Sequence, residues 1–286
     1  MIVDQLRELC ARLLSEGTAQ VVIGYGQAAP GKPAYPVFIR RAEDADQLVW
    51  NDQCMTNLAA TLKRREVKAL GKPAVIVKGC DERALIMLAK ESQIVRANIY
   101  VIGVECNGAG RPAMAKCASC DVHVPRWTDT VIRETESQAA AVRTTPSSAR
   151  YADLEAFMRK TPEARLAFWR AEFGRCVKCY ACRQVCPLCY CERCIADKNR
   201  PCVIDTSATP KGNFAWHITR AFHLAARCAG CDECARACPA HIDLRLLNLA
   251  LAAAAEDHFG WRAGMDPEAE PPAGAYSLKD KEDFIG

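Results

Sequence analysis

The sequence predicts an α/β domain in the first half of the chain and a mostly α-helical, cysteine-rich domain in the second. Up to about residue 133, short apolar runs alternate with amphipathic stretches, a succession typical of an α/β layer. Twelve of the 18 cysteines then lie between Cys176 and Cys238, in a region whose apolar residues recur at helical spacing. The two halves therefore differ in both pattern and composition.

The composition argues against several classes of protein. With 286 residues, 50% of them hydrophobic, the chain is long enough for two packed domains. A formal charge of +4 without a run of basic residues argues against nucleic-acid binding. The longest strongly apolar stretch, residues 246–255, is too short to span a membrane, and residues 1–10 lack the pattern of an export signal. We therefore expect a cytoplasmic protein whose thiols are reduced.

The elements of the first half follow from its apolar periodicity. Buried strands are expected at residues 19–23, 37–39, 74–77 and 99–104, and helices at residues 4–14, 55–65 and 81–91. Two of the strands are followed closely by a cysteine, Cys80 and Cys106. Functional residues of a parallel sheet gather at the carboxyl ends of its strands, so these cysteines are candidates for a site.

Composition also predicts the domain boundaries. Residues 1–133 form the α/β domain, and residues 134–150, rich in Ser, Thr, Pro and Ala, form a linker. A helix over 151–170 opens the second domain, which extends to residue 265. Residues 266–286 form an extended tail with six acidic residues against two lysines. The tail is either solvated or a strap that docks on a partner.

Two cysteine runs of identical spacing dominate the second half. Each reads Cys-x2-Cys-x2-Cys-x3-Cys-Pro, one from Cys176 to Pro187 and the other from Cys228 to Pro239. This is the complete bacterial ferredoxin signature, whose fourth cysteine ligates the other cluster. One 4Fe-4S cluster is therefore assigned to Cys176, Cys179, Cys182 and Cys238, and the other to Cys228, Cys231, Cys234 and Cys186. Zinc does not explain the third cysteine of each run or its proline.

The second half resembles two-cluster ferredoxins, and more closely their helical variants in multi-subunit oxidoreductases. The stretch over residues 222–244, FHLAARCAGCDECARACPAHIDL, looks like the second-cluster segment of such subunits. Helical spacing before Cys228 and after Pro239 predicts helices packed around the clusters.

The insert between the two runs is also rich in cysteine. Its four cysteines are Cys189, Cys191, Cys194 and Cys202. They could hold an additional cluster or a zinc ion, or remain unligated thiols near the first cluster. Their spacing does not decide between these alternatives.

Four cysteines of the first half form a looser set: Cys80, Cys106, Cys117 and Cys120. Two strand ends and a nearby Cys-x2-Cys loop can converge on one ion or cluster. Alternatively, Cys80 and Cys106 are small buried residues and the later pair belongs to a zinc knuckle.

The segment over residues 72–132 resembles the beta subunits of deazaflavin-reducing hydrogenases and related formate dehydrogenases. The resemblance rests on a strand followed by Cys80, a strand ending in Gly-x-x-Cys at Cys106, and a Cys-x2-Cys pair. It implies a third 4Fe-4S cluster on Cys80, Cys106, Cys117 and Cys120, beside FAD. Two positions depart from the family: Gly79 replaces a proline, and residues 51–54 (Asn-Asp-Gln-Cys) replace a Ser-Lys-Tyr stretch.

The remaining candidate residues receive structural roles. His123 is expected to be a loop residue, and His217, His223, His241 and His258 are expected to cap or pack helices. Cys10 and Cys54 are expected to be unligated thiols. Walker loops, dinucleotide fingerprints and nucleophile elbows are not found in the sequence.

The sequence therefore predicts an iron–sulfur electron-transfer subunit of a multi-subunit anaerobic oxidoreductase, without a catalytic residue of its own. Its expected partners are hydrogenase, formate dehydrogenase or heterodisulfide-reductase-like subunits. The first alternative is a flavin-containing reductase that exchanges hydride with a deazaflavin or nicotinamide coenzyme. The second is a zinc-bound interaction module.

Overall fold

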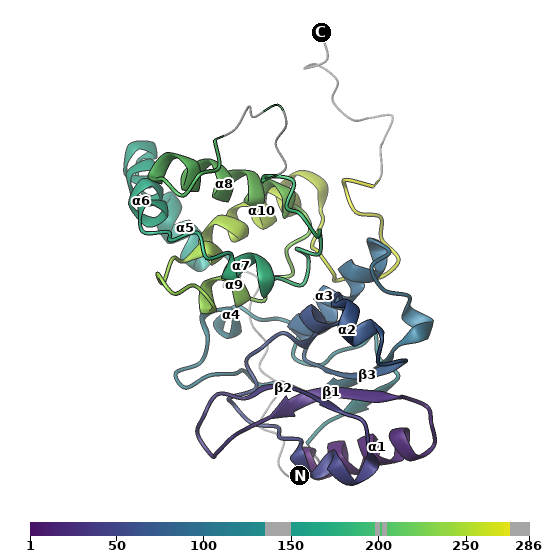
Figure 1. The fold of residues 1–286 in the computed structure, drawn as a ribbon. Coiled ribbons are helices and arrows are strands. Elements are labelled where there is room, and N and C mark those ends of the chain that lie inside the picture. Colours follow the sequence, from purple (N-terminus) through teal and green to yellow (C-terminus); the bar gives the residue numbers. More distant parts are fainter. Residues whose placement is uncertain (135–149, 198–200, 202–204, 275–286) are drawn as a thin grey trace.

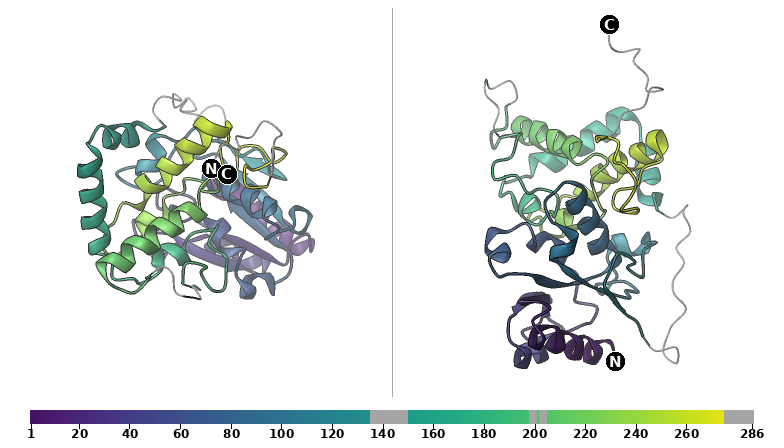
Figure 2. Two further views of the ribbon diagram at one scale, coloured as in Figure 1. Left: turned by 90° about the horizontal axis from the view of Figure 1, so that it is seen from above. Right: turned by 90° about the vertical axis from the view of Figure 1, so that its right-hand side faces the viewer.

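The computed structural model describes residues 1–134, 150–197, 201 and 205–274. Figure 1 shows an α/β part, built from the first half of the chain, beneath a helical part built from the second. In the right-hand view of Figure 2, α1 lies at the end of the α/β part that is farthest from the helical part. Among the described residues, no helix is both long and apolar enough to cross a membrane.

A five-stranded sheet of order β2-β1-β3-β4-β5 forms the centre of the α/β part. β1 pairs antiparallel with β2, and β3, β4 and β5 continue the sheet in parallel. The strands are β1 (Val21–Gly26), β2 (Tyr35–Ile39), β3 (Pro73–Val77), β4 (Tyr100–Val104) and β5 (Thr130–Ile132). β1 and β3 are buried along their whole length, as their continuous apolar runs predict for strands covered on both faces.

Helices cover the two faces of this sheet. α1 (Ile2–Ser15) buries Leu6, Leu9 and Leu13 at helical spacing, and α3 (Gly79–Lys90) lies on the opposite face (Figure 1). Shorter elements connect the strands: η1 (Ala42–Gln47), η2 (Leu58–Thr61), α2 (Arg65–Lys68), η3 (Arg96–Asn98) and α4 (Ala115–Ala118).

The predicted helix over residues 55–65 is wrong. The structure has only η2 there, followed by turns and α2. Asn57 precedes η2 and accepts a hydrogen bond from the Ala59 amide at 3.0 Å, and the Thr61 hydroxyl donates to the Leu58 carbonyl at 2.7 Å. These side chains bond to local backbone groups and so favour a tight turn over a regular α-helix.

In its described residues, the helical part contains four longer helices and two single turns. The longer helices are α5 (Ala152–Met158), α6 (Pro162–Gly174), α8 (Pro210–His223) and α10 (Leu244–Phe259). The single turns are α7 (Ala181–Gln184) and α9 (Glu233–Arg236), and both lie between the longer helices and the α/β part (Figure 1). A small core of Phe173, Trp216, Ile242 and Leu244 packs these elements together.

The single helix expected over residues 151–170 is instead two helices. α5 ends at Met158, and Thr161 begins α6 by accepting a hydrogen bond from the Ala164 amide at 3.2 Å. Pro162 occupies the first turn of α6, where its missing N–H costs nothing. The Thr-Pro pair signals the start of a helix, but the apolar spacing continues across it, so the periodicity alone predicted one long helix.

The segment after α10 folds back onto the α/β part. The Arg83 guanidinium on α3 donates to the Ala263 carbonyl at 3.0 Å, and the Lys90 ammonium donates to the Pro267 carbonyl at 2.7 Å. The first residues of the expected tail therefore pack against this chain's own α3, and residues 275–286 lie outside the described residues.

Candidate metal centres

The first cavity is lined by cysteines from both runs. Its walls include the first three cysteines of one run and the last cysteine of the other: Cys176, Cys179, Cys182 and Cys238. Apolar side chains of Trp216, Ile242 and Leu244 complete it. Cys179 is exposed and Cys182 is buried, so the cavity lies near the protein surface on one side only.

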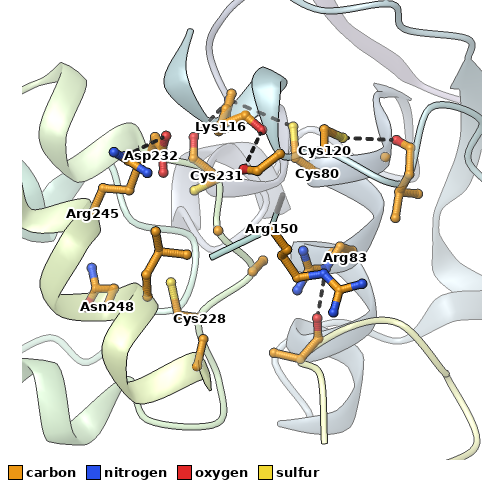
Figure 3. A pocket seen from close by; sticks show the side chains of 18 of the residues that line it. Cys80, Arg83, Lys116, Cys120, Arg150, Cys228, Cys231, Asp232, Arg245 and Asn248 are labelled. Atoms are coloured by element: carbon orange, nitrogen blue, oxygen red, sulfur yellow. Dashed lines mark hydrogen bonds and ion pairs between the residues drawn. The ribbon is translucent and has the colours of Figure 1, made fainter. Parts of the chain in front are cut away.

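A larger cavity lies between the α/β part and the helical part (Figure 3). Two further sets of four cysteines line it. One set crosses between the runs and comprises Cys228, Cys231, Cys234 and Cys186. The other comes from the first half and comprises Cys80, Cys106, Cys117 and Cys120. The structure thus places eight of these twelve cysteines around the larger cavity and the other four around the first, and the division of the eight into two sets of four stays a prediction.

The two cysteine runs share one backbone conformation. Lys178 and Gly230, two residues after the first cysteine of each run, have positive φ angles of 52° and 66°. Tyr180 and Asp232, two residues further on, have φ angles of 60° and 56° and precede α7 and α9. Such left-handed residues turn successive amides toward one side, where they can donate to an anion. The Lys178 amide already donates to the Cys176 sulfur at 3.4 Å.

Sheet topology explains the position of the third set. Cys80 lies in the first turn of α3, directly after β3, and Cys106 follows β4 by two residues. Because β3 and β4 are parallel neighbours, their carboxyl ends meet at one edge of the sheet. Cys117 lies on α4 and Cys120 just beyond it, and all four thiols line the larger cavity.

Gly79 explains one departure from the family pattern. A Cβ atom at this position would clash with the Val122 carbonyl oxygen, in the loop that follows Cys120. The close approach of α3 to this loop therefore requires glycine immediately before Cys80.

We expect the Gly79→Ala variant to lose iron at this edge of the sheet. The added methyl group must push the loop of Cys120 away from Cys80, and overpacking of this kind costs about 1–3 kcal/mol. Iron content and the free energy of unfolding are the measurements. Gly174→Ala is the matched control, because a Cβ atom there meets no other atom within 4 Å. Unchanged iron and stability in Gly79→Ala would show that the contact is not needed.

Burial raises the pKa of two of the thiols that line the cavities, Cys80 and Cys182. The pKa rises to about 12 for Cys80 and to about 11 for Cys182, in both cases mainly because the thiolate would lose its hydration. At neutral pH these side chains are therefore protonated unless a metal binds them, so metal binding must release their protons.

Two buried cations lie beside the cysteine sets. Lys116 is 8% exposed, and its ammonium donates to the Cys231 carbonyl at 2.8 Å. Arg220 is 4% exposed and donates to the Cys182 carbonyl at 3.0 Å, while its Nε has no hydrogen-bond partner among the described residues. Within the described part of the chain, neither side chain has a carboxylate within 4.0 Å. A buried cation without a counter-ion is costly, so both indicate that the cavities normally hold negative charge.

His217, for which only a helix-packing role was predicted, lines the first cavity. Its ring stacks on Phe173, with 4.6 Å between ring centroids, and its Nε2 atom lies 3.3 Å from the Cys176 sulfur. His123 also lies beside a cysteine, with its Nδ1 atom 3.1 Å from the Cys106 carbonyl oxygen. Sequence reasoning did not place His217, Lys116 or Arg220 at a site.

Two formate dehydrogenase subunits are similar to this chain in sequence. The chain matches no family model. It is 22% identical to the beta subunit of an F420-dependent formate dehydrogenase of Methanocaldococcus jannaschii, over 82% of this chain and 85% of the relative. It is also 22% identical to the beta subunit of F420-dependent formate dehydrogenase 1 of Methanococcus maripaludis, over 92% of this chain and 90% of the relative.

The chain is similar in sequence to these beta subunits. The resemblance proposed for residues 72–132 is thereby confirmed, and it extends well beyond them. Since the second match covers 92% of the chain, it includes both the α/β part and the cysteine runs.

The cysteines of the insert do not share a cavity with one another in the described residues. Cys189 packs against the core that contains the sheet, Cys194 packs against the small core of the helical part, and Cys191 is exposed. Cys202 lies outside the described residues. Within the described ranges, no three His, Cys, Asp or Glu side chains are placed to share a single metal ion.

The expected unligated thiols also have defined positions. Cys10 is buried on α1, where the loss of hydration raises its pKa to about 12. Cys54 is buried too, and it lines a third cavity of about 370 Å³. Neither lines one of the two cavities that hold the predicted ligand sets.

The third cavity lies beside the carboxyl ends of β3 and β4. Lys78, Glu105 and Cys106 line it, and residues 50–52 form part of its wall. Lys78 is buried and forms an ion pair with Asp81 at 2.9 Å, while Cys106 also lines the larger cavity. The residues that replace the family's Ser-Lys-Tyr stretch are thus part of a polar cavity next to the third cysteine set.

Proposed function

We propose that this chain is an iron–sulfur electron-transfer subunit of a multi-subunit anaerobic oxidoreductase. The observation that carries the proposal is that twelve cysteines line two cavities, four around the first and eight around the larger one. The relatives' role as beta subunits of formate dehydrogenases supports it. Eighteen cysteines in one chain favour a reducing compartment such as the cytoplasm.

We propose one 4Fe-4S cluster for each set, with the fourth ligand exchanged between the runs. Cys176, Cys179, Cys182 and Cys238 hold the first cluster. Cys228, Cys231, Cys234 and Cys186 hold the second, and Cys80, Cys106, Cys117 and Cys120 hold the third. The side chains present fit this group: thiols line each site, and the unpartnered Nε of Arg220 and the ammonium of Lys116 supply positive charge.

The clusters, when bound, supply one-electron transfer. The protein binds them through thiolates and donates backbone amides to those thiolates, as Lys178 does to Cys176. Buried apolar side chains such as Trp216 and Ile242 exclude water from the first site, and lower local polarity strengthens each hydrogen bond and charge contact there. The insert cysteines remain outside this assignment because the described ones pack in different cores.

A second function, hydride exchange at FAD in the α/β part, is favoured by the third cavity. This cavity shares Cys106 with the third cysteine set, so a flavin bound there would lie next to that cluster. The relatives are F420-dependent, and F420 is a deazaflavin, so the coenzyme that exchanges hydride would be a deazaflavin, or else a nicotinamide. In that case the chain would be a reductase rather than a relay alone.

Anaerobic purification from the native source tests both functions. We expect about twelve iron and twelve sulfide per chain, the content of three 4Fe-4S clusters. We also expect hydrogenase, formate dehydrogenase or heterodisulfide-reductase-like subunits to copurify. Stoichiometric flavin would favour the reductase. Stoichiometric zinc with little iron, or a stable monomer that turns over a small substrate alone, would contradict the electron-transfer subunit.

A further inference from the structure

Lys116 contacts two of the cysteine sets at once. Its ammonium donates to the carbonyl of Cys231, in the second set, at 2.8 Å and lies 3.8 Å from the sulfur of Cys80, in the third set. Figure 3 shows Lys116 between these two cysteines. The lysine comes from α4, directly before Cys117, so it is fixed by the same short helix that presents a ligand of the third set.

Arg220 occupies the equivalent position on the other side of the second set. It donates to the carbonyl of Cys182, in the first set, at 3.0 Å, and Cys186 and Cys234 of the second set are among the groups that raise its pKa. It lies on α8 and is buried. The second set is therefore the only one of the three, within the described residues, that is next to both cations.

We propose that Lys116 and Arg220 are positioning residues that tune the reduction potentials of neighbouring clusters in pairs, with the Cys228 cluster common to both pairs. Lys116 would act on the third and second clusters, and Arg220 on the second and first. The proposal rests on the proposed function, because it requires that clusters occupy the three sets.

The physical basis is charge compensation in a medium of low polarity. Reduction adds one negative charge to a cluster, and a fixed cation nearby stabilises that charge and raises the potential. Neither cation forms an ion pair within 4.0 Å in the described part of the chain, and the carboxylates of Asp232 and Glu233 act on Lys116 only from a greater distance. Lys63 is not a third such residue, because its ammonium donates to the carbonyls of Cys186, in the second set, and of Cys189, in the insert, and so reaches only one set.

The test is an anaerobic redox titration of the full chain monitored by electron paramagnetic resonance. Signals are assigned with Cys80→Ser, Cys231→Ser and Cys179→Ser, each of which alters one cluster. In Lys116→Met, we expect the oxidised-to-reduced ratio at fixed potential to rise at least tenfold for the second and third clusters, about 59 mV for a one-electron couple. The first cluster should keep its potential. In Arg220→Met, the first and second clusters should shift and the third should not.

Several variants keep the test decisive. Lys116→Arg retains the charge and should retain the potentials, and Lys116→Gln replaces Lys116→Met if the latter does not fold. Lys90→Met is the matched control, because the Lys90 ammonium also donates to backbone carbonyls but lines none of the cavities. Wild-type chain without iron would overturn the proposed function itself. Wild-type chain with three clusters whose potentials do not change in Lys116→Met, or change for one cluster only, would overturn this inference alone.

Discussion

The Cys186→Ala variant is expected to lose the cluster of the other cysteine run, not of its own. Cys186 belongs by sequence to the run that begins at Cys176, yet it lines the larger cavity with Cys228, Cys231 and Cys234. Removing one of four thiolates leaves a cluster with an open site that is readily lost, so iron should fall by up to four atoms, from about twelve to about eight per chain. Cluster spectra and iron content are the measurements.

Matched variants identify which cluster is lost. If the fourth ligands are exchanged, Cys186→Ala should give the same residual spectrum as Cys231→Ala. Cys238→Ala should then match Cys179→Ala. Cys191→Ala serves as the control, since this insert thiol is exposed and lines neither of the two cavities. A Cys186→Ala spectrum that instead matches Cys179→Ala would contradict the exchange.

The prediction of the cysteine sets rests on local information in the sequence. The spacing within each run fixes three ligands on one short loop, and the proline after the fourth cysteine separates that residue from the others. Likewise, continuous apolar runs predicted β3 and β4, and the cysteines after them follow from strand order. Each of these features depends on residues a few positions apart.

The buried cations Lys116 and Arg220 could not be placed from the sequence because their partners are distant in sequence. Lys116 and the Cys231 carbonyl are 115 residues apart, and Arg220 and the Cys182 carbonyl are 38 residues apart. No local pattern distinguishes a lysine that closes an interface from one that is solvated. One weak signal existed for Lys116, which directly precedes the predicted ligand Cys117.

The errors in secondary structure have a related cause. Apolar periodicity extended helices across residues 55–65 and 151–170, whereas side chains that bond to the local backbone decide where helices begin and end. Asn57 and Thr61 hold a tight turn in the first case, and Thr161 with Pro162 starts a new helix in the second. β5, with only three residues, carries too little pattern to be recognised.

The second large effect is expected for the α/β part. In the Cys80→Ala variant, iron should fall from about twelve to about eight atoms per chain, with loss of one spectral component that both Cys179→Ala and Cys231→Ala retain. The reason is geometric: Cys80 lies in the first turn of α3 and lines the larger cavity together with Cys106, Cys117 and Cys120. No neighbouring thiol of another set can replace it without leaving its own cluster incomplete.

Cys10→Ala is the control for this prediction, because Cys10 is buried on α1, away from both cysteine-lined cavities. It should leave iron and spectra unchanged. If Cys80→Ala instead retained full iron and all spectral components, the four thiols of the first half would be structural, and the α/β part would contribute no cluster. The chain would then carry two clusters, both in the helical part, and Lys116 would have only one site to act on. The iron content of this single variant therefore decides between a relay that begins at the sheet edge and one confined to the two cysteine runs.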